Sequence, residues 1–322
     1  MEKTSSKNWK FKEMLQKFSK DYMIVFALIA LVIVFSIVNE NYLTRDNIIT
    51  IFLQTSTIAI VAVGQGMLIM MGKVDISLGY SVCLSCFVSA TLMHDFGWNP
   101  WLALLAGILT CVAAGTITGI FTAYLRVPAF IAALAMQNVC KGFAMMITNA
   151  RVVAPLPESI RFIGKGYIGP IPFSVILMIF IVIVMHLVMQ YTRFGRTIYA
   201  IGGNPEAAFF VGVNVEKYYV LVYALSGLFA GISASVLVSR LNAASTTNGV
   251  GYEFEAMIAA CVGGVSFTGG KGKMLGILFG ALFSVALFNG MTMANVNAFL
   301  QNVIKGIVLL AAVTLDVQRN HK

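Results

Sequence analysis

Long runs without charged residues are the feature that most restricts how this chain can fold. Residues 96–125 and 166–192 contain no Asp, Glu, Lys or Arg, and both runs are predominantly apolar. A helix that crosses the hydrocarbon core of a bilayer needs about 20 such residues. Over all 322 residues, 59% are hydrophobic and 11% are charged, against about 25% charged residues in soluble domains. This composition excludes a soluble globular protein, a disordered chain and a secreted disulfide scaffold.

The apolar runs predict an all-α integral membrane protein with about ten transmembrane helices. The third and eighth are both short, and glycine-rich breaks border them. The run 274–304 is too long for one helix, and Asn289-Gly290, with Asn295 and Asn297, predicts a turn inside it. The predicted spans lie near residues 22–38, 48–71, 77–94, 101–124, 128–149, 173–191, 218–239, 253–267, 274–293 and 298–315.

The first span is not followed by a small-residue cleavage site, so we interpret it as an uncleaved helix and not as a signal peptide. The chain is then divided into a basic tail 1–21, a transmembrane domain 22–316 and a short tail 317–322. With an even number of spans, both tails lie on the same side of the membrane.

The distribution of Lys and Arg predicts that this side is the cytoplasm. Of the 22 such residues, fifteen fall in segments on the side of the chain ends and five on the opposite side, while Lys141 and Lys305 lie within spans. Cytoplasmic segments carry the excess of Lys and Arg in membrane proteins. The net charge of +9 therefore orients the protein and gives no support to a nucleic-acid partner. The five residues on the opposite side are Arg45, Arg151, Arg161, Lys165 and Arg240.

The five cysteines all lie in apolar runs, which indicates buried reduced thiols. The three histidines are scattered and do not combine with them in the spacing of a metal site. We therefore predict no metal and no cofactor in this chain.

The long connection 192–217, on the predicted cytoplasmic side, contains the signals of a short helix. Asn204 is a favourable N-cap, Pro205 suits the first helical position, and Glu206 complements the positive helix end. These signals predict a helix over Pro205–Val213. It is either a well-capped connector between two spans or a docking helix that inserts into a cytoplasmic partner.

The same segment carries a family resemblance. Glu206-Ala207-Ala208 followed by Gly212 resembles the coupling loop of ABC-importer permeases, and the whole run 192–208 is similar to permeases of the ribose/galactose/xylose type. Residues 72–79, 258–272 and 301–306 resemble the same family, except that Lys73 replaces a glycine that usually precedes the hydrophobe–Asp pair. By this resemblance the ATPase-coupling residues are Arg193, Gly195, Arg196, Asn204, Pro205, Glu206, Ala207, Ala208 and Gly212.

The resemblance also implies the assembly. It implies a permease that works as a pair, most simply a homodimer, in the bacterial cytoplasmic membrane. A separate ATPase subunit would use ATP and Mg, and an extracytoplasmic sugar-binding protein would deliver a monosaccharide, with a ribose-like sugar as the expected substrate.

The glycine-rich segment 263–276 is not a nucleotide-binding loop. A Walker A motif needs G-x4-G-K-[S/T], whereas Gly272 follows Lys271 and Val265 stands at the first glycine position. We expect no ATP hydrolysis in this chain, and we interpret the glycines as sites of close helix packing or of a broken membrane helix. The gate or packing residues, in this segment and in residues 72–79, are Gly72, Asp75, Ser77, Gly79, Gly263, Gly264, Gly269 and Gly270.

Asp75, at the end of the second span, has three interpretations. It is the N-cap of the third span, a proton-coupling carboxylate, or part of a cytoplasmic gate, and we favour a gate or packing role because it lies in the family motif. Lys141 and Lys305 lie within predicted spans, where an unpaired cation costs about 2.5–3.5 kcal/mol. Each is expected to snorkel, to pair or to face a hydrated cavity, and no acid is evident as a partner for Lys305 within the membrane.

A sugar path needs uncharged polar side chains on interior faces of the bundle. Hydrogen bonds between helices are the alternative role for each such residue. The candidate path residues are Gln54, Gln65, Gln137, Asn138 and Asn289.

The sequence thus favours the membrane subunit of an ATP-driven monosaccharide importer. The alternative is a self-sufficient secondary sugar transporter or facilitator, which would need intramembrane acids for ion coupling. No acid lies well inside a predicted span; the candidates are the boundary residues Asp75, Glu253 and Glu255, which is evidence against this alternative. An integral-membrane enzyme would need a cluster of reactive side chains that this chain lacks.

Overall fold

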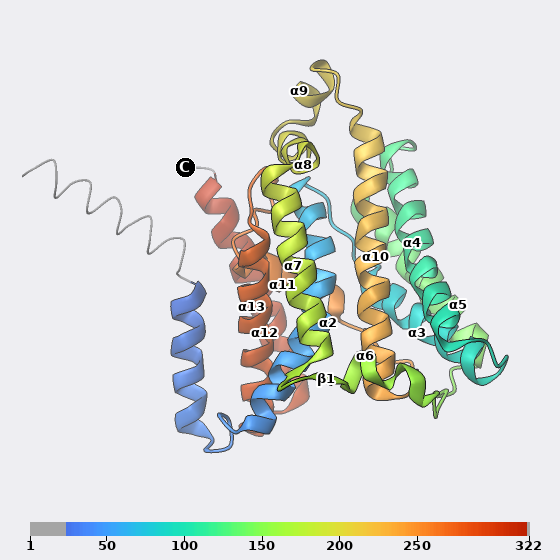
Figure 1. Cartoon of the computed structure of the whole chain (residues 1–322). Helices are drawn as coiled ribbons and strands as arrows, with labels where there is room; N and C mark the ends of the chain where they lie inside the picture. Colours follow the sequence, from blue (N-terminus) through green and yellow to red (C-terminus); the bar gives the residue numbers. More distant parts are fainter. Residues whose placement is uncertain (1–23, 321–322) are drawn as a thin grey trace, which may run out of the picture.

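The computed structural model describes residues 24–320, which form a helical bundle (Figure 1). The predicted basic tail 1–21 lies outside the described residues. Each of the ten predicted spans contains a helix. These helices are Ile24–Val38, α2 (Arg45–Met70), α3 (Leu78–His94), α4 (Pro100–Ala123), α5 (Ala129–Thr148), α7 (Phe173–Tyr191), α10 (Val215–Leu241), α11 (Tyr252–Val262), α12 (Met274–Met293) and α13 (Ala298–Asn320).

Seven helices of the described chain are long and apolar enough to cross a membrane: α2, α4, α5, α7, α10, α12 and α13. The helix Ile24–Val38 and α3 are apolar but shorter, and α11 has only 11 residues. The structure therefore supports a multi-helix membrane protein, with seven helices that meet the length of a span.

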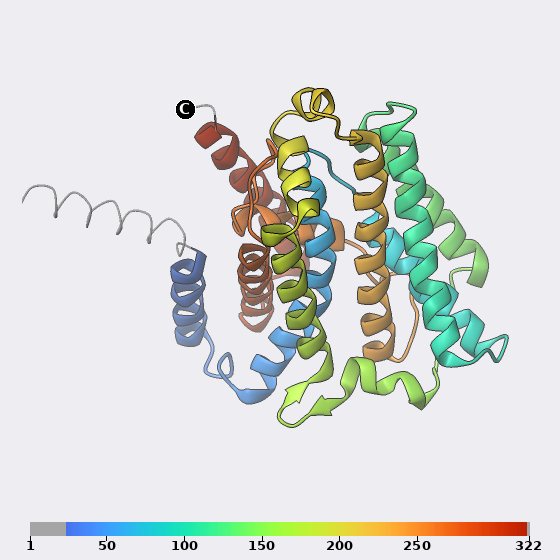
Figure 2. The same ribbon diagram turned by 45° about the horizontal axis from the view of Figure 1, so that its top comes forward.

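Smaller elements lie at the two ends of the bundle (Figures 1 and 2). One end, here called the α9 end, carries α8 (Arg193–Gly203) and α9 (Pro205–Phe210). The opposite end, the α6 end, carries the single 3-10 turn Glu158–Ile160, α6 (Arg161–Lys165) and a two-stranded antiparallel hairpin of β1 (Tyr167–Ile168) and β2 (Ile171–Pro172). Short helices and the hairpin thus lie at the two ends, and long apolar helices form the bundle between them.

The two longest helices, α2 and α10, form the interior. Every residue of α2 from Thr55 to Met70 is buried. Small residues let neighbouring backbones approach closely, as is common between membrane helices. An added Cβ at Gly231 of α10 would lie 2.6 Å from the Cα of Ile108 in α4, and one at Gly64 of α2 would lie 2.7 Å from the Cα of Ser226.

One predicted span ends too late. The eighth helix ends at Val262 and not near residue 267, because Gly264, with φ +85°, turns the chain into a loop. The predicted break between the ninth and tenth spans is confirmed: α12 ends at Met293, and Asn295, with φ +56°, lies in the turn before α13. The α12 helix continues through residue 290 because the Asn289 amide is satisfied by a reciprocal pair of hydrogen bonds with Asn47, at 3.0 and 2.9 Å.

Candidate functional site

The short helix α9 begins where the sequence predicts it. The Asn204 Oδ1 atom accepts a hydrogen bond from the backbone N–H of Ala207 at 3.0 Å, Pro205 occupies the first position, and Glu206 lies in the first turn. The predicted end at Val213 is wrong, since α9 stops at Phe210.

The cause of this early end is a closed C-terminal turn. Gly212 has φ +86° and donates its N–H to the Phe209 carbonyl at 2.9 Å, and Val213 donates to the Ala208 carbonyl at 3.1 Å. This is the Schellman arrangement, in which a left-handed glycine satisfies the last helical carbonyls. The segment is therefore rigidly terminated at both ends.

The tip of α9 presents apolar side chains to the surroundings. Phe209, Phe210 and Val211 are 59%, 82% and 80% exposed. Glu206 is exposed beside them, while Ala208 is buried. Exposed apolar side chains gathered at one point of a surface are typical of a contact with another molecule.

The helix α8, which the sequence analysis did not predict, carries the first part of the predicted coupling loop. The Thr192 hydroxyl caps it by accepting from the Gly195 N–H at 3.4 Å. Arg193 and Arg196 are exposed, whereas Gly195 is buried against the backbone of Met189. The two arginines are thus accessible to another molecule, and the glycine is needed for close packing on α7.

The glycine-rich loop between α11 and α12 lies directly against α8. An added Cβ at Gly202 would overlap the carbonyl oxygen of Met70 and lie 2.5 Å from the backbone nitrogen of Gly270. The Tyr199 hydroxyl donates to the Gly272 carbonyl at 2.9 Å, and the Gly270 N–H donates to the Met70 carbonyl at 2.8 Å. The structure therefore brings the predicted coupling segment, the glycines 269 and 270 and the end of α2 into one contact.

Two side chains that sequence reasoning missed hold this contact. Asp316 of α13 accepts from the Ser266 hydroxyl at 3.0 Å and from the Phe267 N–H at 2.8 Å. Tyr199 is half-buried, and this burial raises the pKa of its hydroxyl. One signal was available for Asp316, because it is the only acid in the apolar segment 298–320.

The other predicted gate glycines divide between packing and turns. Gly263 packs on the backbone of Gly276, so that α11 and α12 approach closely. Gly72 and Gly264 have positive φ values of 68° and 85°, and no atom lies within 4 Å of an added Cβ at either position.

Asp75 is fully buried between α2 and α3. Its Oδ1 atom accepts from the Ser77 N–H at 2.8 Å and from the Ser77 hydroxyl at 2.6 Å, and its own N–H donates to Gln65 Oε1 at 3.3 Å. The N-cap interpretation of Asp75 is wrong, because Ser77 is the N-cap residue of α3; the Asp75 carboxylate instead holds the turn that leads into α3. The other oxygen, Oδ2, makes no hydrogen bond to a described residue.

A second buried acid, Glu253, meets the start of α3 from the start of α11. Its carboxylate lies against Gly79, where an added Cβ would overlap Oε2 and lie 2.8 Å from the Gly249 carbonyl oxygen. Glu253 is 2% exposed, and its Oε2 makes no hydrogen bond within the described chain. We call this meeting of the first turns of α3 and α11 the helix junction. Gly79 is required there because any side chain would displace Glu253.

Lys305 forms an ion pair, one of the three outcomes expected for it, with an acid that the sequence did not identify as its partner. Its Nζ forms an ion pair with Glu255 of α11 and lies 4.7 Å from the centre of the Phe288 ring. Lys141 is exposed, and its Nζ lies 5.5 Å from the centre of the Tyr80 ring. Sequence spacing could not show the Lys305 pair because the two residues are 50 positions apart.

The predicted path residues are spread over three helices, α2, α5 and α12. Asn138 is exposed and donates to the Leu134 carbonyl of its own helix at 2.9 Å. Gln65 is buried beside Asp75, while Gln54 and Gln137 are half-buried. The structure does not bring these amides together in one lining. Within residues 24–320, no group of three or more His, Cys, Asp or Glu is arranged to hold a metal ion.

Known proteins match this chain over nearly its whole length. A family described as "Branched-chain amino acid transport system / permease component" matches residues 47–313. The ribose import permease protein RbsC of Escherichia coli (strain K12) is 36% identical over 294 residues, covering 90% of this chain and 91% of the relative.

Two further relatives show the same coverage. The ribose import permease protein RbsC of Bacillus subtilis (strain 168) is 34% identical over 295 residues, 91% of each chain. The D-allose transport system permease protein AlsC of Escherichia coli (strain K12) is 33% identical over 298 residues, 92% of this chain and 91% of the relative.

Proposed function

This chain belongs to the permease-component family that its sequence matches over residues 47–313, and from this premise we propose that it is the membrane subunit of an ATP-driven monosaccharide importer. A ribose-like sugar is the proposed substrate, since two of the relatives above are named ribose import permeases. A separate ATPase subunit would supply the energy, using ATP and Mg. An extracytoplasmic binding protein would deliver the sugar.

The α9 tip carries this proposal. Glu206 and the exposed side chains of Phe209, Phe210 and Val211 form a small amphipathic knob at the end of the bundle. The knob is rigid because its helix is capped at both ends. An ATPase subunit that receives this knob could therefore push or pull the whole α8–α9 unit.

The glycine-rich loop offers a path from that unit into the bundle. Movement of α8 would act on the Met70 end of α2 through Gly202 and Gly270, and on α11 through the loop itself. The opposite end of α11 bears Glu253 at the helix junction. Transport requires that ATPase docking favour one conformation of the bundle over the other, because a contact of equal strength in both would couple nothing.

The proposed topology is ten spans with both chain ends in the cytoplasm. The α9 end would face the cytoplasm, and the α6 end would face the binding protein. The short helices α3 and α11 would then each cross part of the membrane, which membrane proteins tolerate where the non-helical backbone is buried in protein. A second copy of the chain would complete the importer. The candidate path residues Gln54, Gln65, Gln137, Asn138 and Asn289, which do not form one lining in the single chain, would then each contribute to a different part of the path.

The charge of Glu206 provides the test. We expect Glu206→Lys to abolish sugar uptake in cells that express the ATPase and the binding protein, because it reverses the charge of the knob at a positive helix end. Membrane insertion should be unchanged, since the side chain is exposed. Lys217→Glu, which reverses an exposed charge in the first turn of α10 at the same end, is the control. Normal uptake by the Glu206→Lys protein with its ATPase still bound would contradict the coupling assignment.

The secondary-transporter alternative is supported by one observation. Asp75 and Glu253 are buried inside the bundle, where ion-coupled transporters place acids. Uptake by the purified chain alone in liposomes, collapsed by an ionophore, would establish that alternative. An ATPase subunit that copurifies with the wild type and is lost from the Glu206→Lys protein would establish the importer.

A further inference from the structure

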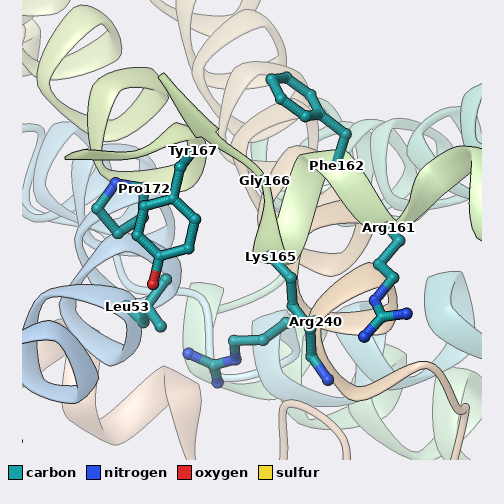
Figure 3. Close-up of a pocket in the computed structure, with 8 residues that line it drawn as sticks. All are labelled: Leu53, Arg161, Phe162, Lys165, Gly166, Tyr167, Pro172 and Arg240. Atoms are coloured by element: carbon teal, nitrogen blue, oxygen red, sulfur yellow. The ribbon is translucent and has the colours of Figure 1, made fainter. Parts of the chain in front are cut away.

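A basic pocket lies at the α6 end, away from both the α9 tip and the helix junction. Its cavity of about 620 Å³ lies between α2, α6, the β1–β2 hairpin and the last turn of α10 (Figure 3). Three cationic side chains line it: Arg161 and Lys165 of α6, and Arg240 of α10. Leu53, Tyr167 and Pro172 provide apolar walls.

The cations of this pocket have little compensation from carboxylates of the described chain. Arg161 approaches only Glu158, at 3.8 Å and with both side chains well exposed. Within the described part of the chain, no acid forms an ion pair with Lys165 or Arg240. Arg151, at the same end, contrasts with them because it pairs with Asp95 at 2.6 Å.

The number of these cations is also informative. Five Lys and Arg residues lie in the connecting segments predicted to face away from the cytoplasm, and three of the five line this one cavity. Cations in such segments oppose the usual distribution, and like charges in one concavity repel each other. The arrangement therefore favours an anion supplied from outside the chain.

The geometry indicates the chemistry of that anion. In Figure 3 the Lys165 side chain lies between the Arg240 guanidinium, which turns toward Leu53, and the Arg161 guanidinium. Charged donors held on two elements around one cavity can surround the oxygens of a phosphate group. Basic pockets between membrane helices bind lipid headgroups in this way.

The depth of the pocket identifies the source of the phosphate. Leu53 lies eight residues after Arg45, about 12 Å along α2 at 1.5 Å per residue, so the cavity reaches below the helix ends. Tyr167, Ile168 and Ile171 are exposed at the hairpin beside it, and aromatic and apolar side chains at this level are typical of a membrane interface. We propose that this pocket binds the phosphate of an anionic phospholipid, with the headgroup on the three cations and an acyl chain along Leu53.

This proposal rests only on the membrane-spanning part of the proposed function and not on its sugar or ATPase. A bound lipid would join α2, α6 and α10, and it should therefore stabilise the folded chain in proportion to its occupancy. Sugar uptake and lipid binding can thus fail independently of each other.

The test compares phosphatidylglycerol with phosphatidylcholine on the purified full chain, by native mass spectrometry and by the shift in melting temperature. We expect the wild type to retain phosphatidylglycerol preferentially. The double variant Lys165→Gln/Arg240→Gln should bind it about tenfold or more weakly, because two charge-assisted hydrogen bonds are lost. Arg45→Gln, which removes one positive charge at the same end outside the pocket, should bind like the wild type.

Lys165→Arg should also retain binding, and it serves as a second variant if the double variant does not fold. Equal affinity of the double variant and the wild type for phosphatidylglycerol would overturn the proposal. So would an equal loss in Arg45→Gln, which would indicate unspecific attraction. Displacement by excess inorganic phosphate without any lipid preference would identify a free-anion site instead. If the double variant lost the binding of an acidic binding protein while it still bound phosphatidylglycerol like the wild type, the pocket would be a protein contact and the lipid proposal would be overturned.

Discussion

The two ends of the bundle are built in opposite ways. At the α9 end, backbone packs on backbone: Gly202 of α8 lies against Met70 and Gly270, with no room for a Cβ atom. At the α6 end, a hairpin and a five-residue helix border an open cavity of about 620 Å³ that is lined by the cations Arg161, Lys165 and Arg240. Rigid contact suits the transmission of movement, whereas an open charged cavity suits the capture of a ligand.

This difference also explains where charge is tolerated. The exposed charges of the α9 end, such as Arg193 and Glu206, project away from the packed glycines. The cations of the α6 end instead share one concavity, so their repulsion depends on what occupies it. The comparison can be tested by changing the packing at one end and the charge at the other.

The largest effect is expected from Gly202→Ala at the α9 end. The added Cβ would overlap the Met70 carbonyl, and overpacking of this kind typically costs about 1–3 kcal/mol. We expect a lower melting temperature in detergent and a loss of sugar uptake.

Gly203→Ala is the control, since no atom lies within 4 Å of an added Cβ at that position. Alanine in a helix is favoured over glycine by about 0.5–1 kcal/mol, so this variant should be unchanged or slightly more stable. Equal behaviour of the two variants would show that the end is not tightly packed.

A smaller effect is expected from Tyr199→Phe, which removes only the hydrogen bond to the Gly272 carbonyl. One such bond contributes about 1 kcal/mol. The variant should fold and bind its ATPase, but sugar transported per ATP hydrolysed should fall several-fold in the reconstituted importer. Tyr191→Phe, exposed at the same end, should leave this ratio unchanged. A normal ratio in Tyr199→Phe would remove the glycine-rich loop from the coupling path.

The smallest effect is expected at Asp95, on the α6 end. The hydrogen bond from His94, and then the proximity of Arg151, hold the pKa of its carboxyl below the usual value. A lowered pKa means that Asp95 stabilises the fold above the usual carboxyl pKa, and that this contribution disappears as the pH falls through the lowered value. The group is well exposed, so the change in melting temperature should be small.

A pH series of melting temperatures for wild type and Asp95→Asn measures this contribution. The two curves should differ slightly at neutral pH and converge in acid. Glu158→Gln, whose carboxylate lies 3.8 Å from Arg161 with both side chains exposed, should match the wild type throughout. A constant difference across the series would mean that Asp95 acts through packing and not through its charge.

Local signals predicted much of the fold. Uncharged runs located all ten helices, and the Asn204-Pro205-Glu206 sequence located the start of α9, because capping depends on residues within one turn of each other. The predicted end of α9 at Val213 was wrong. The helix stops at Phe210 because Gly212 adopts a left-handed conformation, which the residues around it do not require.

Contacts between distant segments were beyond these signals. The Asn289-Gly290 pair has the composition of a turn, yet Asn289 remains helical because Asn47, 242 residues away, satisfies its amide. The sequence did not identify a partner for Lys305, because Glu255 becomes its neighbour only through the packing of α13 on α11. Each outcome depends on which helices become neighbours.

The sequence by itself thus determined the class of protein, the helices and the family, because apolar length, capping and motif are properties of consecutive residues. The tertiary structure alone decided that α8 rests on the glycine-rich loop, that Asp75 and Glu253 are both buried at the junction, and that Arg161, Lys165 and Arg240 share a pocket. The physical reason is that burial and charge proximity depend on distances in space, which packing of whole helices sets after the local structure has formed.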